Sequence, residues 1–495
     1  MQVILTQREF MKKVLFSHSY FLRFDPKQWA TAQPYAPLGT LYAAAMIRNH
    51  GYQVSFFDSM FANNPGAVLS QIEKNNPAFF VIYDDGFNYL TKMCLTNMRN
   101  AAFEMIRFAK QRGCIVIVSS SDSTDHYHEY LEKGADFILM GEGEVTLLEL
   151  LNAITQGKDD FFCIQGLAFQ QNGSPIKTPP RNVLRDLDSL PFPAWDIIDL
   201  EPYRNMWMAS SGYFSMNMGT TRGCPFKCNW CAKPIYGNRY NSRSPGNVME
   251  ELKMLKERYQ FDHIWFCDDI FGLKPGWVDE FANLVNEEKL RFRFKIQSRA
   301  DLLVQENYIE ALAKAGCDNA WMGAESGSQK ILDAMDKGTT VEQIYEATRI
   351  LKKHRIKPSF FIQFGYPGEA KDDIEKTIRL INELLPSEIG ISISYPLPGT
   401  KFFEKVKGEL SEKSNWTDSD ELKLMFKNTY PAAFYKQLHR YVHKNYRKHL
   451  AFSNIKKIFS DPRGMTIKNI KKAASVAYYV PATFFARKKL EAIKE

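Results

Sequence analysis

The first 165 residues alternate short apolar runs with longer amphipathic segments. Apolar residues recur at helical spacing in residues 38–51 and 98–113, and both segments end in glycine, as helices often do. This alternation predicts a mostly parallel, doubly wound sheet that binds ligands at the C-terminal ends of its strands. The apolar runs have the length and the Val, Ile and Phe content of buried strands, and they occupy residues 12–19, 52–58, 77–85, 114–121 and 135–141.

A second alternating series begins near residue 215. Six successive β/α units predict a partial barrel or an open parallel sheet. The strand-like runs occupy residues 214–223, 263–269, 293–299, 319–326, 358–367 and 388–397. The helical patterns between them occupy residues 247–259, 276–288, 306–316, 341–354 and 371–385.

Turn-rich segments divide the chain. Pro191 and Pro193 interrupt regular helix between the two series, and beyond about residue 401 the pattern becomes helical, aromatic and basic. The expected organisation is a Rossmann-like domain at residues 1–165, a connector at 166–205, a barrel at 206–415 and a basic helical region at 416–495.

Composition is that of a globular protein, with 45% hydrophobic and 24% charged residues. No N-terminal signal peptide is recognisable, and the most apolar stretch, residues 473–486, is shorter than the ~20 residues that span a bilayer and contains Pro481. Eight cysteines are too few for a disulfide framework in 495 residues. We therefore expect a cytoplasmic protein whose clustered cysteines bind metal or act in redox chemistry.

Positive charge is concentrated at the C-terminal end. Residues 434–495 carry 15 Lys and Arg against 3 Asp and Glu, which leaves 49 basic against 53 acidic residues in the rest of the chain. The main body is therefore not expected to bind nucleic acid. Two interpretations of the basic region stay open, a solvated helical cap and a peripheral anchor on the inner face of a membrane. RNA binding is a third, for which no recognised signature is present.

Three cysteines follow the first strand of the second series. Cys224, Cys228 and Cys231 have the spacing C-x3-C-x2-C, in a loop where such folds place active sites. A structural zinc site is the alternative, but it needs four protein ligands, and Cys267 and Cys317 are isolated residues of predicted strands. Three thiolates can instead hold three irons of a [4Fe–4S] cluster and leave the fourth iron open.

This motif resembles the signature of the radical S-adenosylmethionine (SAM) superfamily, including the aromatic Trp230 before the last cysteine. The resemblance implies that the open iron binds the amino and carboxylate groups of SAM. It also implies that an electron from the cluster cleaves SAM to a 5′-deoxyadenosyl radical, which abstracts a hydrogen atom. An electron donor such as flavodoxin or ferredoxin is implied as a partner.

The resemblance extends to the ends of the following strands, which line the SAM pocket in related enzymes. Ser298, Arg299 and Glu325 would bind the ribose and methionine portions, and residues 364–367 would flank the adenine. The alternative for each charged residue is a salt bridge at the barrel end, for example between Arg299 and Glu325. The implied SAM-binding residues are Trp230, Asp268, Asp269, Ser298, Arg299, Glu325 and Tyr366.

A Rossmann-like half before a radical SAM half resembles the cobalamin-binding class of this superfamily. That class is typified by the anaerobic magnesium-protoporphyrin monomethyl ester cyclase and by several C-methyltransferases. The resemblance covers about residues 12–410 and rests on the motifs at residues 35–58, 134–151 and 187–196. The implied cobalamin-binding residues are Pro37, Leu38, Gly39, Ser119, Ser120, Gly141 and Glu142.

One departure concerns the histidine that ligates cobalt in many cobalamin proteins. The D-x-H-x-x-G motif is absent, and His126 and His128 have the wrong spacing and are interpreted as polar loop residues. Residues 119–121 are serines where the family usually has a Gly-rich loop. A sheet that has lost the cofactor is therefore the alternative to cobalamin binding.

Together these resemblances imply an enzyme that methylates, cyclises, oxidises or rearranges an unactivated carbon of a small-molecule, lipid-like or tetrapyrrole substrate. The sequence assigns no catalytic acid or base. A non-catalytic cobalamin or iron–sulfur sensor is the alternative, although no recognisable output domain is present. A zinc-bound structural protein is the third interpretation.

Overall fold

The computed structural model describes residues 11–233, 235–410, 413, 415–460 and 466–493. The chain divides into two compact units. The first lies within residues 1–225, 233–296 and 415–421, and the second within residues 226–232, 297–414 and 422–495. The division falls inside the cysteine motif, so Cys224 belongs to the first unit and Cys228 and Cys231 belong to the second.

A seven-stranded sheet forms the centre of the first unit, in the order β2-β1-β3-β4-β5-β6-β7. Strand β1 pairs in parallel with both β2 and β3, so the connections reverse direction between β1 and β3. This reversal is the topological switch point of a doubly wound sheet. The parallel strands are β1 (Lys13–Ser17), β2 (Gln53–Phe57), β3 (Phe79–Tyr83), β4 (Ile115–Ser119) and β5 (Phe137–Leu139), and β6 (Leu167–Gln171) and β7 (Ser174–Lys177) are antiparallel.

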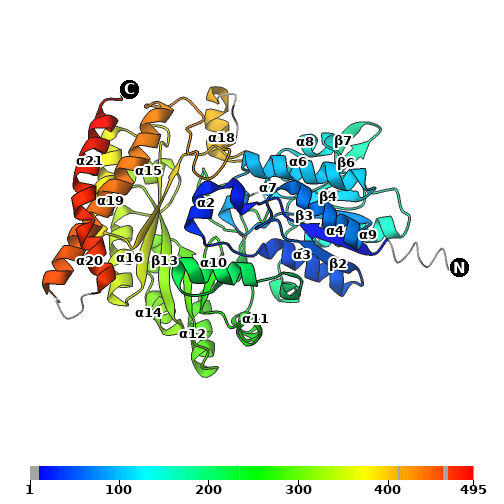
Figure 1. Ribbon diagram of the computed structural model, residues 1–495, viewed down its shortest axis with the longest axis horizontal. Coiled ribbons are helices and arrows are strands. Elements are labelled where there is room, and N and C mark those ends of the chain that lie inside the picture. Colours follow the sequence, from blue (N-terminus) through cyan, green and yellow to red (C-terminus); the bar gives the residue numbers. More distant parts are fainter. Residues whose placement is uncertain (1–10, 234, 411–412, 414, 461–465, 494–495) are drawn as a thin grey trace. The chain divides into compact units, whose positions relative to one another are not determined.

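Helices cover both faces of this sheet (Figure 1). Helices α3 (Leu38–Asn49) and α9 (Glu144–Thr155) pack on the face that carries Val14 and Phe16. Helices α4 (Val68–Asn75) and α6 (Thr96–Gln111) pack on the face that carries Leu15. Successive strand residues point to opposite faces, so a strand buried on both sides needs an uninterrupted apolar run. The predicted Rossmann-like, doubly wound sheet is thereby confirmed.

The hairpin of β6 and β7 was not expected from the sequence. It lies in the segment interpreted as a connector, and β6 pairs with β5. Its turn residues Asn172 and Gly173 have φ of 52° and 78°, as a type I′ turn requires. Asn-Gly between two short β-prone runs was thus a specific hairpin signal, which the turn-rich composition of the segment obscured. The domain boundaries expected from composition stay predictions.

The second alternating series forms a six-stranded sheet with its strands in sequence order. The pairs β8–β11, β11–β12, β13–β14 and β14–β15 are parallel. Sequence order and parallel pairing confirm the predicted partial (β/α)6 barrel. The strands are β8 (Ser215–Met218), β11 (His263–Phe266), β12 (Arg293–Ser298), β13 (Cys317–Glu325), β14 (Lys357–Phe364) and β15 (Glu388–Ile393).

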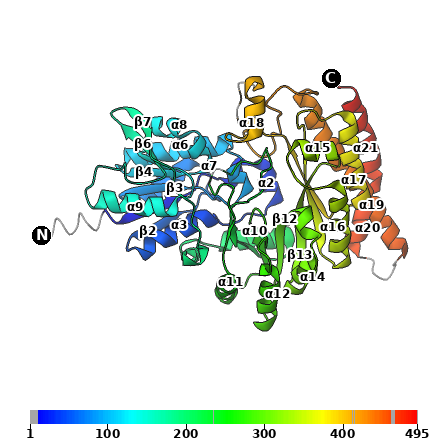
Figure 2. The same cartoon turned by 180° about the vertical axis from the view of Figure 1, so that it is seen from behind.

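Each barrel helix lies where helical spacing predicted it. Ser244 and Thr340 cap the first turns of α11 and α16 by accepting hydrogen bonds from the backbone amides of Asn247 and Gln343. In the second unit, α16 packs against β13 and β14 (Figure 2). The barrel helices are α11 (Pro245–Tyr259), α12 (Trp277–Glu287), α14 (Tyr308–Ala315), α16 (Val341–Lys353) and α17 (Lys371–Leu384).

Several short elements connect these layers. The minor strands β9 (Thr221–Arg222) and β10 (Asn241–Ser242) pair antiparallel on either side of the cysteine motif. The remaining short helices are α2 (Pro26–Thr31), α5 (Tyr89–Lys92), α7 (Ser121–Asp125), α8 (Tyr127–Glu132), α10 (Glu201–Ser211), α13 (Ala300–Leu303), α15 (Gln329–Ala334) and α18 (Lys401–Val406).

The C-terminal region is helical, as its pattern predicted. It comprises α19 (Ala432–Ser460), α20 (Ile467–Ala474) and α21 (Val476–Glu491). Helix α19 packs on the barrel, where the Tyr446 hydroxyl donates to the Pro386 carbonyl at 2.7 Å. Helix α21 packs on α19, where Gln437 Nε2 donates to the Ala486 carbonyl at 2.9 Å. Within the described residues, no helix has the length and apolarity needed to cross a membrane.

Candidate cofactor sites

Asp268, at the end of β11, fixes the backbone that leads into the cysteine motif. Its Oδ1 accepts hydrogen bonds from the amides of Thr220 and Thr221 at 2.7 and 2.8 Å, and its Oδ2 accepts from Thr220 Oγ1 at 2.5 Å. The side chain is buried, and burial raises the pKa of Asp268 to about 6 against the opposing effect of these hydrogen bonds. Both oxygens of the Asp268 carboxylate are thus engaged by Thr220 and Thr221. The SAM contact implied for Asp268 stays a prediction.

Two buried glutamates hold Arg222, which lies two residues before Cys224. Arg222 Nη1 donates to Glu142 Oε1, and Nη2 lies 2.7 Å from Glu144 Oε1. All three side chains are buried, and the Arg222 guanidinium lies 5.2 Å from the centroid of the Tyr236 ring. Burial raises the pKa of Glu142, although Arg222 opposes the shift. The two glutamates of the G-E-G-E motif therefore bind the strand before the cysteines through Arg222, an arrangement that we call the Arg222 clamp. The sequence did not reveal this role.

The cysteine motif is held in the second unit by Asn229. The Asn229 amide donates to the Met335 carbonyl at 3.0 Å, and Asn229 Nδ2 donates to the Ala334 carbonyl at 2.8 Å. The Tyr366 hydroxyl donates to Asn229 Oδ1 at 2.9 Å, and the Phe402 amide donates to the Asn229 carbonyl at 2.9 Å. Tyr366, predicted to flank adenine, is thus a buried support for the residue between Cys228 and Trp230.

Basic side chains surround the second half of the motif. Arg299 Nη1 lies 3.7 Å from Cys228 Sγ, and the guanidinium stacks 3.7 Å above the centroid of the Phe226 ring. Lys337 Nζ lies 5.9 Å from the centroid of the Trp230 ring. Positive charge beside a thiol favours the thiolate, which is the form that binds iron.

The alternative of a salt bridge for each charged residue is met, but the pair named as its example, Arg299 with Glu325, does not form. Arg299 pairs instead with Asp301, with Nε 2.9 Å from Oδ1, and Glu325 Oε1 pairs with Lys337 Nζ at 2.7 Å. Arg299 Nη2 also donates to the Lys337 carbonyl at 2.8 Å. Glu325 has φ of 57° at a register shift of β13. Such an irregularity changes the direction in which the side chain at the end of a strand points.

Among the described residues of the second unit, seven buried polar side-chain atoms lack a hydrogen-bond partner, and two of them lie where the sequence predicts SAM binding. They are Ser298 Oγ, at the end of β12, and Trp230 Nε1, inside the cysteine motif. Buried polar atoms are almost always paired in native proteins, so unmet capacity in the cysteine motif and at the end of β12 is compatible with a ligand there. With the cation of Arg299 beside Cys228, these residues fit the hydroxyls and carboxylate of SAM next to an iron–sulfur cluster.

The eight cysteines, all of which the structure describes, form no disulfide. In the part of the chain that is described, no three His, Cys, Asp or Glu side chains are gathered as around a metal ion. The assignment of the three cysteines to a cluster therefore rests on their motif and surroundings.

A small pocket opens in the first unit beside the switch point of the seven-stranded sheet. Asp84 accepts hydrogen bonds from the amide and hydroxyl of Ser19 at 2.6 and 2.8 Å. Asp85 accepts from the amides of Gly39 and Phe87 at 3.1 and 3.0 Å, and burial raises the pKa of Asp85 to about 6. The pocket is lined by Tyr83, Asp84, Asp85, Gly86, Thr91, Ser119, Ser121, Ile235 and Tyr236.

The residues implied for cobalamin are only partly brought to this pocket. Ser119 lines it, and Gly39 lies against its rim, where an added Cβ would come within 3.3 Å of the Asp85 Cα. Pro37 and Leu38 begin α3, and Leu38 is buried in the core. The other cobalamin candidates have structural roles: Ser120 caps α7, Gly141 adopts φ of 78°, and Glu142 binds Arg222.

Among the SAM candidates, Asp269 pairs with Lys92 at 2.6 Å.

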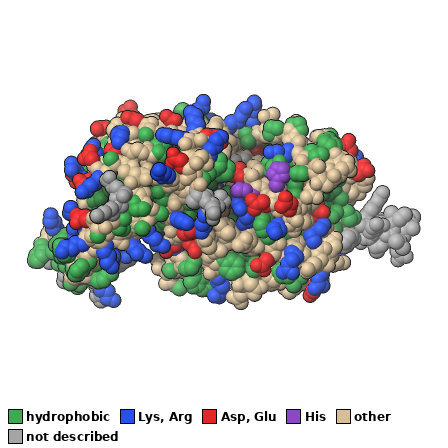
Figure 3. Space-filling view, turned by 90° about the horizontal axis from the view of Figure 1, so that it is seen from above, with side chains coloured by type: hydrophobic (Ala, Val, Ile, Leu, Met, Phe, Trp, Pro, Cys, Tyr) green, Lys and Arg blue, Asp and Glu red, His purple; other side chains and the backbone are tan. Residues whose placement is uncertain are grey.

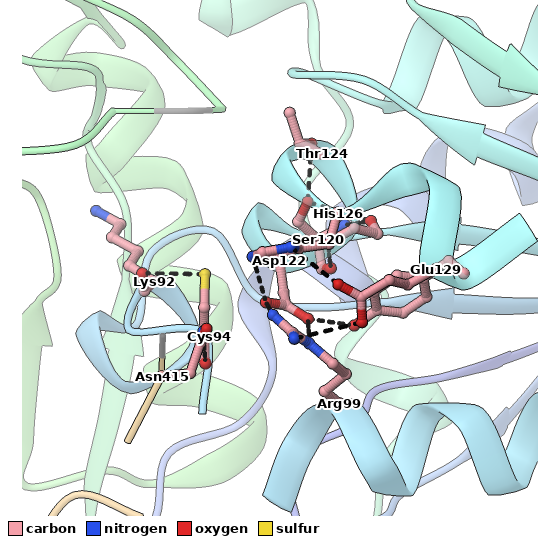
Figure 4. Close-up of polar contacts among 11 residues, drawn as sticks. Lys92, Cys94, Arg99, Ser120, Asp122, Thr124, His126, Glu129 and Asn415 are labelled. Carbon is pink, nitrogen blue, oxygen red and sulfur yellow. Dashed lines mark hydrogen bonds and ion pairs between the residues drawn. The ribbon is translucent and has the colours of Figure 1, made fainter. Parts of the chain in front are cut away.

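His126 joins a polar network instead of reaching toward this pocket (Figure 4). It lies between α7 and α8, with Nδ1 3.2 Å from Glu129 Oε1. At the centre of the network, Asp122 accepts hydrogen bonds from Arg99 Nη2 at 2.6 Å and from the Tyr130 hydroxyl at 2.7 Å. These partners agree with the interpretation of His126 as a polar loop residue.

Comparison with known proteins agrees with this architecture. Residues 218–381 match a sequence-family profile described as the Radical SAM superfamily. The matched part of the chain holds the C-x3-C-x2-C motif and strands β11 to β14, so residues 218–381 form a radical SAM domain and the protein is an enzyme.

The relatives extend beyond the barrel. An uncharacterized methyltransferase of Pyrococcus horikoshii is 27% identical over 386 residues, which cover 77% of this chain and 80% of that protein. The anaerobic magnesium-protoporphyrin IX monomethyl ester cyclase of Rubrivivax gelatinosus is 26% identical over 303 residues, covering 59% of this chain and 53% of the cyclase. The hopanoid C-3 methylase of Methylococcus capsulatus is 22% identical over 384 residues, covering 76% of this chain and 70% of the methylase.

Two solved structures share the fold over most of the chain. The cobalamin-dependent radical SAM enzyme OxsB, with aqua-cobalamin bound, has a TM-score of 0.72 and 14% identity, covering 96% of this chain and 72% of OxsB. The methyltransferase TsrM from Kitasatospora setae, with cobalamin and a [4Fe–4S] cluster bound, has a TM-score of 0.67 and 18% identity, covering 80% of this chain and 74% of TsrM.

Proposed function

We propose that this enzyme cleaves SAM at a [4Fe–4S] cluster and modifies an unactivated carbon, with cobalamin as its second cofactor. The observation that carries the proposal is a three-cysteine motif with the Arg299 cation beside Cys228 and with unmet hydrogen-bonding capacity at Trp230 and Ser298. When bound, the cluster and SAM supply a 5′-deoxyadenosyl radical for hydrogen abstraction, and cobalamin supplies a transferable methyl group.

The chain's own residues would bind and orient these groups. Cys224, Cys228 and Cys231 would ligate iron, and Arg299 would stabilise the negative charge of the thiolates and of the SAM carboxylate. Ser298 would donate to a hydroxyl or carboxylate of SAM. Asn229 and Tyr366 would act as positioning residues, because they hold the loop and not the ligand.

Cobalamin is proposed for the C-terminal edge of the seven-stranded sheet. The support is the pocket at the switch point and the fold shared with two cobalamin enzymes. The pocket is small, and Ile235 and Tyr236 are among its lining residues. The histidine motif that ligates cobalt in many cobalamin proteins is absent from the sequence. The visible spectrum of protein purified with hydroxocobalamin tests this part of the proposal, since retained corrin absorbs near the protein's own iron–sulfur band but with a distinct shape.

Anaerobic reconstitution with iron and sulfide tests the radical chemistry. The wild type is expected to bind about four irons per chain and to form 5′-deoxyadenosine from SAM under reductant. Single changes of Cys224, Cys228 or Cys231 to Ala should abolish both, whereas Cys163→Ala, at an exposed cysteine outside the motif, should change neither. A colourless protein with one zinc per chain would contradict the proposal.

Partners and substrate are also proposed. The reductant would be a flavodoxin or ferredoxin, which supplies one electron at a time. The named activities of relatives on a protoporphyrin ester and a hopanoid support a large, apolar substrate. Such a substrate fits a cytoplasmic enzyme in peripheral contact with a membrane through its basic C-terminal region.

A further inference from the structure

The last helix, α21, is packed on one side only. Its buried residues are Thr483 and Ala486, and the Ala486 carbonyl accepts a hydrogen bond from Gln437 Nε2 of α19 at 2.9 Å. The Tyr479 hydroxyl accepts from Arg447 Nη1 of α19 at 3.3 Å. These residues follow one another at intervals of three or four, so they mark the stripe of α21 that faces α19.

Most of the rest of α21 is exposed, with apolar side chains up to Phe485 and charged side chains from Arg487 onward. Tyr478, Phe484 and Phe485 have exposed fractions of 61%, 55% and 62%, and Val480 has 44%. Two further apolar side chains of the C-terminal region are exposed: Ile470 of α20, at 44%, and Phe459 at the end of α19, at 82%. We call these six side chains the ring face. Single exposed apolar residues are ordinary, but a gathered set indicates an interaction surface.

Cations accompany the ring face. Lys471 and Lys472 of α20 and Lys488 and Lys489 of α21 are exposed, and Lys488 Nζ lies 4.7 Å from the centroid of the Phe484 ring. Figure 3 shows hydrophobic and basic side chains intermingled at its left-hand end, where Figure 1 places these helices. Helix α20 contains no acidic residue, and residues 434–495 carry 15 basic against 3 acidic residues.

Rings and cations together point to one kind of partner. An acidic protein would neutralise the lysines but would leave no reason for exposed aromatic rings. An anionic lipid surface satisfies both, because acyl chains accept the rings while phosphates attract the lysines. A helix of 16 residues is about 24 Å long, so α21 lying flat presents its exposed side along its whole length.

We propose that α20 and α21 dock on an anionic lipid bilayer, with the ring face inserted among the acyl chains and the lysines on the headgroup phosphates. This inference deepens the membrane contact of the proposed function. It does not depend on the radical chemistry, since the docking residues lie outside the cysteine motif and the strand ends.

Vesicle flotation of the full-length, reconstituted enzyme tests the proposal. The wild type is expected to float with vesicles of phosphatidylcholine and phosphatidylglycerol and to bind far less to phosphatidylcholine alone. Changing Lys471 and Lys472 to Gln should weaken binding about 30-fold, from about 1 kcal/mol for each basic residue near an anionic surface. Changing Phe484 and Phe485 to Ser should weaken it by at least tenfold.

Matched controls separate docking from general effects. Phe162→Ser removes an exposed ring of the first unit, 48% exposed, and Lys74→Gln removes an exposed lysine of α4, and neither should alter binding. Equal 5′-deoxyadenosine formation and iron content in all variants would show that the cofactor sites are intact, so failure of docking and failure of the proposed chemistry are distinguishable.

Two results would overturn the proposal. One is an absence of wild-type binding to anionic vesicles at about 0.1 M salt. The other is equal vesicle binding by the wild type and both docking variants. Loss of flavodoxin binding in the Lys471 and Lys472 variant, without vesicle binding by the wild type, would identify the surface as a protein-docking site instead.

Discussion

At the scale of single residues, Glu369 has a protonation state unlike that of an exposed carboxyl. Its Oε2 accepts a hydrogen bond from the Gly365 amide at 2.6 Å, whereas Oε1 is buried without a partner. Burial raises the pKa of Glu369 to about 8. The side chain therefore holds its proton at neutral pH in the folded state and releases it when the chain unfolds.

Glu369→Gln removes this linkage. Because the folded state binds its proton more tightly than the unfolded state, the free energy of unfolding of the wild type falls as pH rises from about 4.5 to about 8. A neutral glutamine does not titrate. The melting temperature of the variant minus that of the wild type should therefore rise between about pH 4.5 and pH 8 and stay constant at higher pH. Thermal unfolding between pH 4 and 9 measures the difference, and two parallel curves would contradict the raised pKa.

Tyr366 and Asn229 are expected to retain the cluster and not to perform chemistry. Tyr366→Phe removes the hydroxyl that donates to Asn229 Oδ1, and Asn229→Ala also removes the bond to the Ala334 carbonyl. Each hydrogen bond contributes about 1 kcal/mol, so both variants should bind iron but lose it faster to a chelator, Asn229→Ala more than Tyr366→Phe. The bleaching rate of the iron–sulfur absorbance measures this.

The control for that experiment is Tyr345→Phe, which removes another hydroxyl of the second unit, bonded to Glu383 at 2.5 Å. Its bleaching rate should equal that of the wild type. If all three variants bleach at the wild-type rate, the loop does not depend on Asn229.

Motif residues were predictable from the sequence, whereas their partners were not. The spacing of the cysteines and the strand-end positions of Ser298 and Glu325 are local properties of the chain. The partner of Glu325 is Lys337, on the segment after α15, and that pairing depends on how the chain folds back beside a register shift of β13. Charge alone made Arg299 an equally reasonable partner, which is why the suggested pair was wrong.

At the scale of elements, the Arg222 clamp joins the loop between β5 and α9 to the strand before the cysteines. The three charges are buried, so their attraction must offset a large cost of desolvation. Arg222→Met leaves Glu142 and Glu144 buried without a counter-charge and should lower the free energy of unfolding by about 3–5 kcal/mol. Chemical denaturation measures this loss.

The triple variant R222M/E142Q/E144Q separates charge from shape. With no buried charge left, most of the lost stability should return. If the triple variant is as unstable as R222M, the arginine contributes through packing on Tyr42 and Tyr236 and not through its ion pairs.

Element type was predictable wherever the period of apolar residues was unambiguous. Buried strands such as β3 and β4 are uninterrupted apolar runs, and α16 and α17 show a clear helical stripe. Short elements were missed, because α7 and β10 are too brief for any period to show. The β6–β7 hairpin is different, since its Asn-Gly turn was specific and the surrounding prolines and serines hid it.

At the scale of the whole molecule, the two alternating series sufficed to predict the fold class, but not how the basic C-terminal region is built. Composition marked that region as one segment, yet its helices differ in what they bury. Helix α19 buries Tyr435, Leu438 and Val442, and its Asn445 Nδ2 donates to Asn382 Oδ1 of α17 at 3.0 Å. Helix α20, by contrast, exposes its described lysines and Ile470. Sequence composition cannot separate a packed helix from an exposed one when both are basic and aromatic.

Truncation should reveal this division. A chain ending at residue 460 keeps α19 on the barrel and loses only what lies beyond it, so it should fold, bind iron and form 5′-deoxyadenosine near the wild-type rate. A chain ending at residue 431 exposes the apolar surface that Tyr435, Leu438 and Val442 cover, and each such side chain contributes about 1.5–3 kcal/mol, so it should aggregate on expression. Soluble yield, iron content and deoxyadenosine formation measure the outcome. A soluble, active chain ending at residue 431 would mean that the barrel does not need α19, and that all three C-terminal helices are free to serve the membrane contact alone.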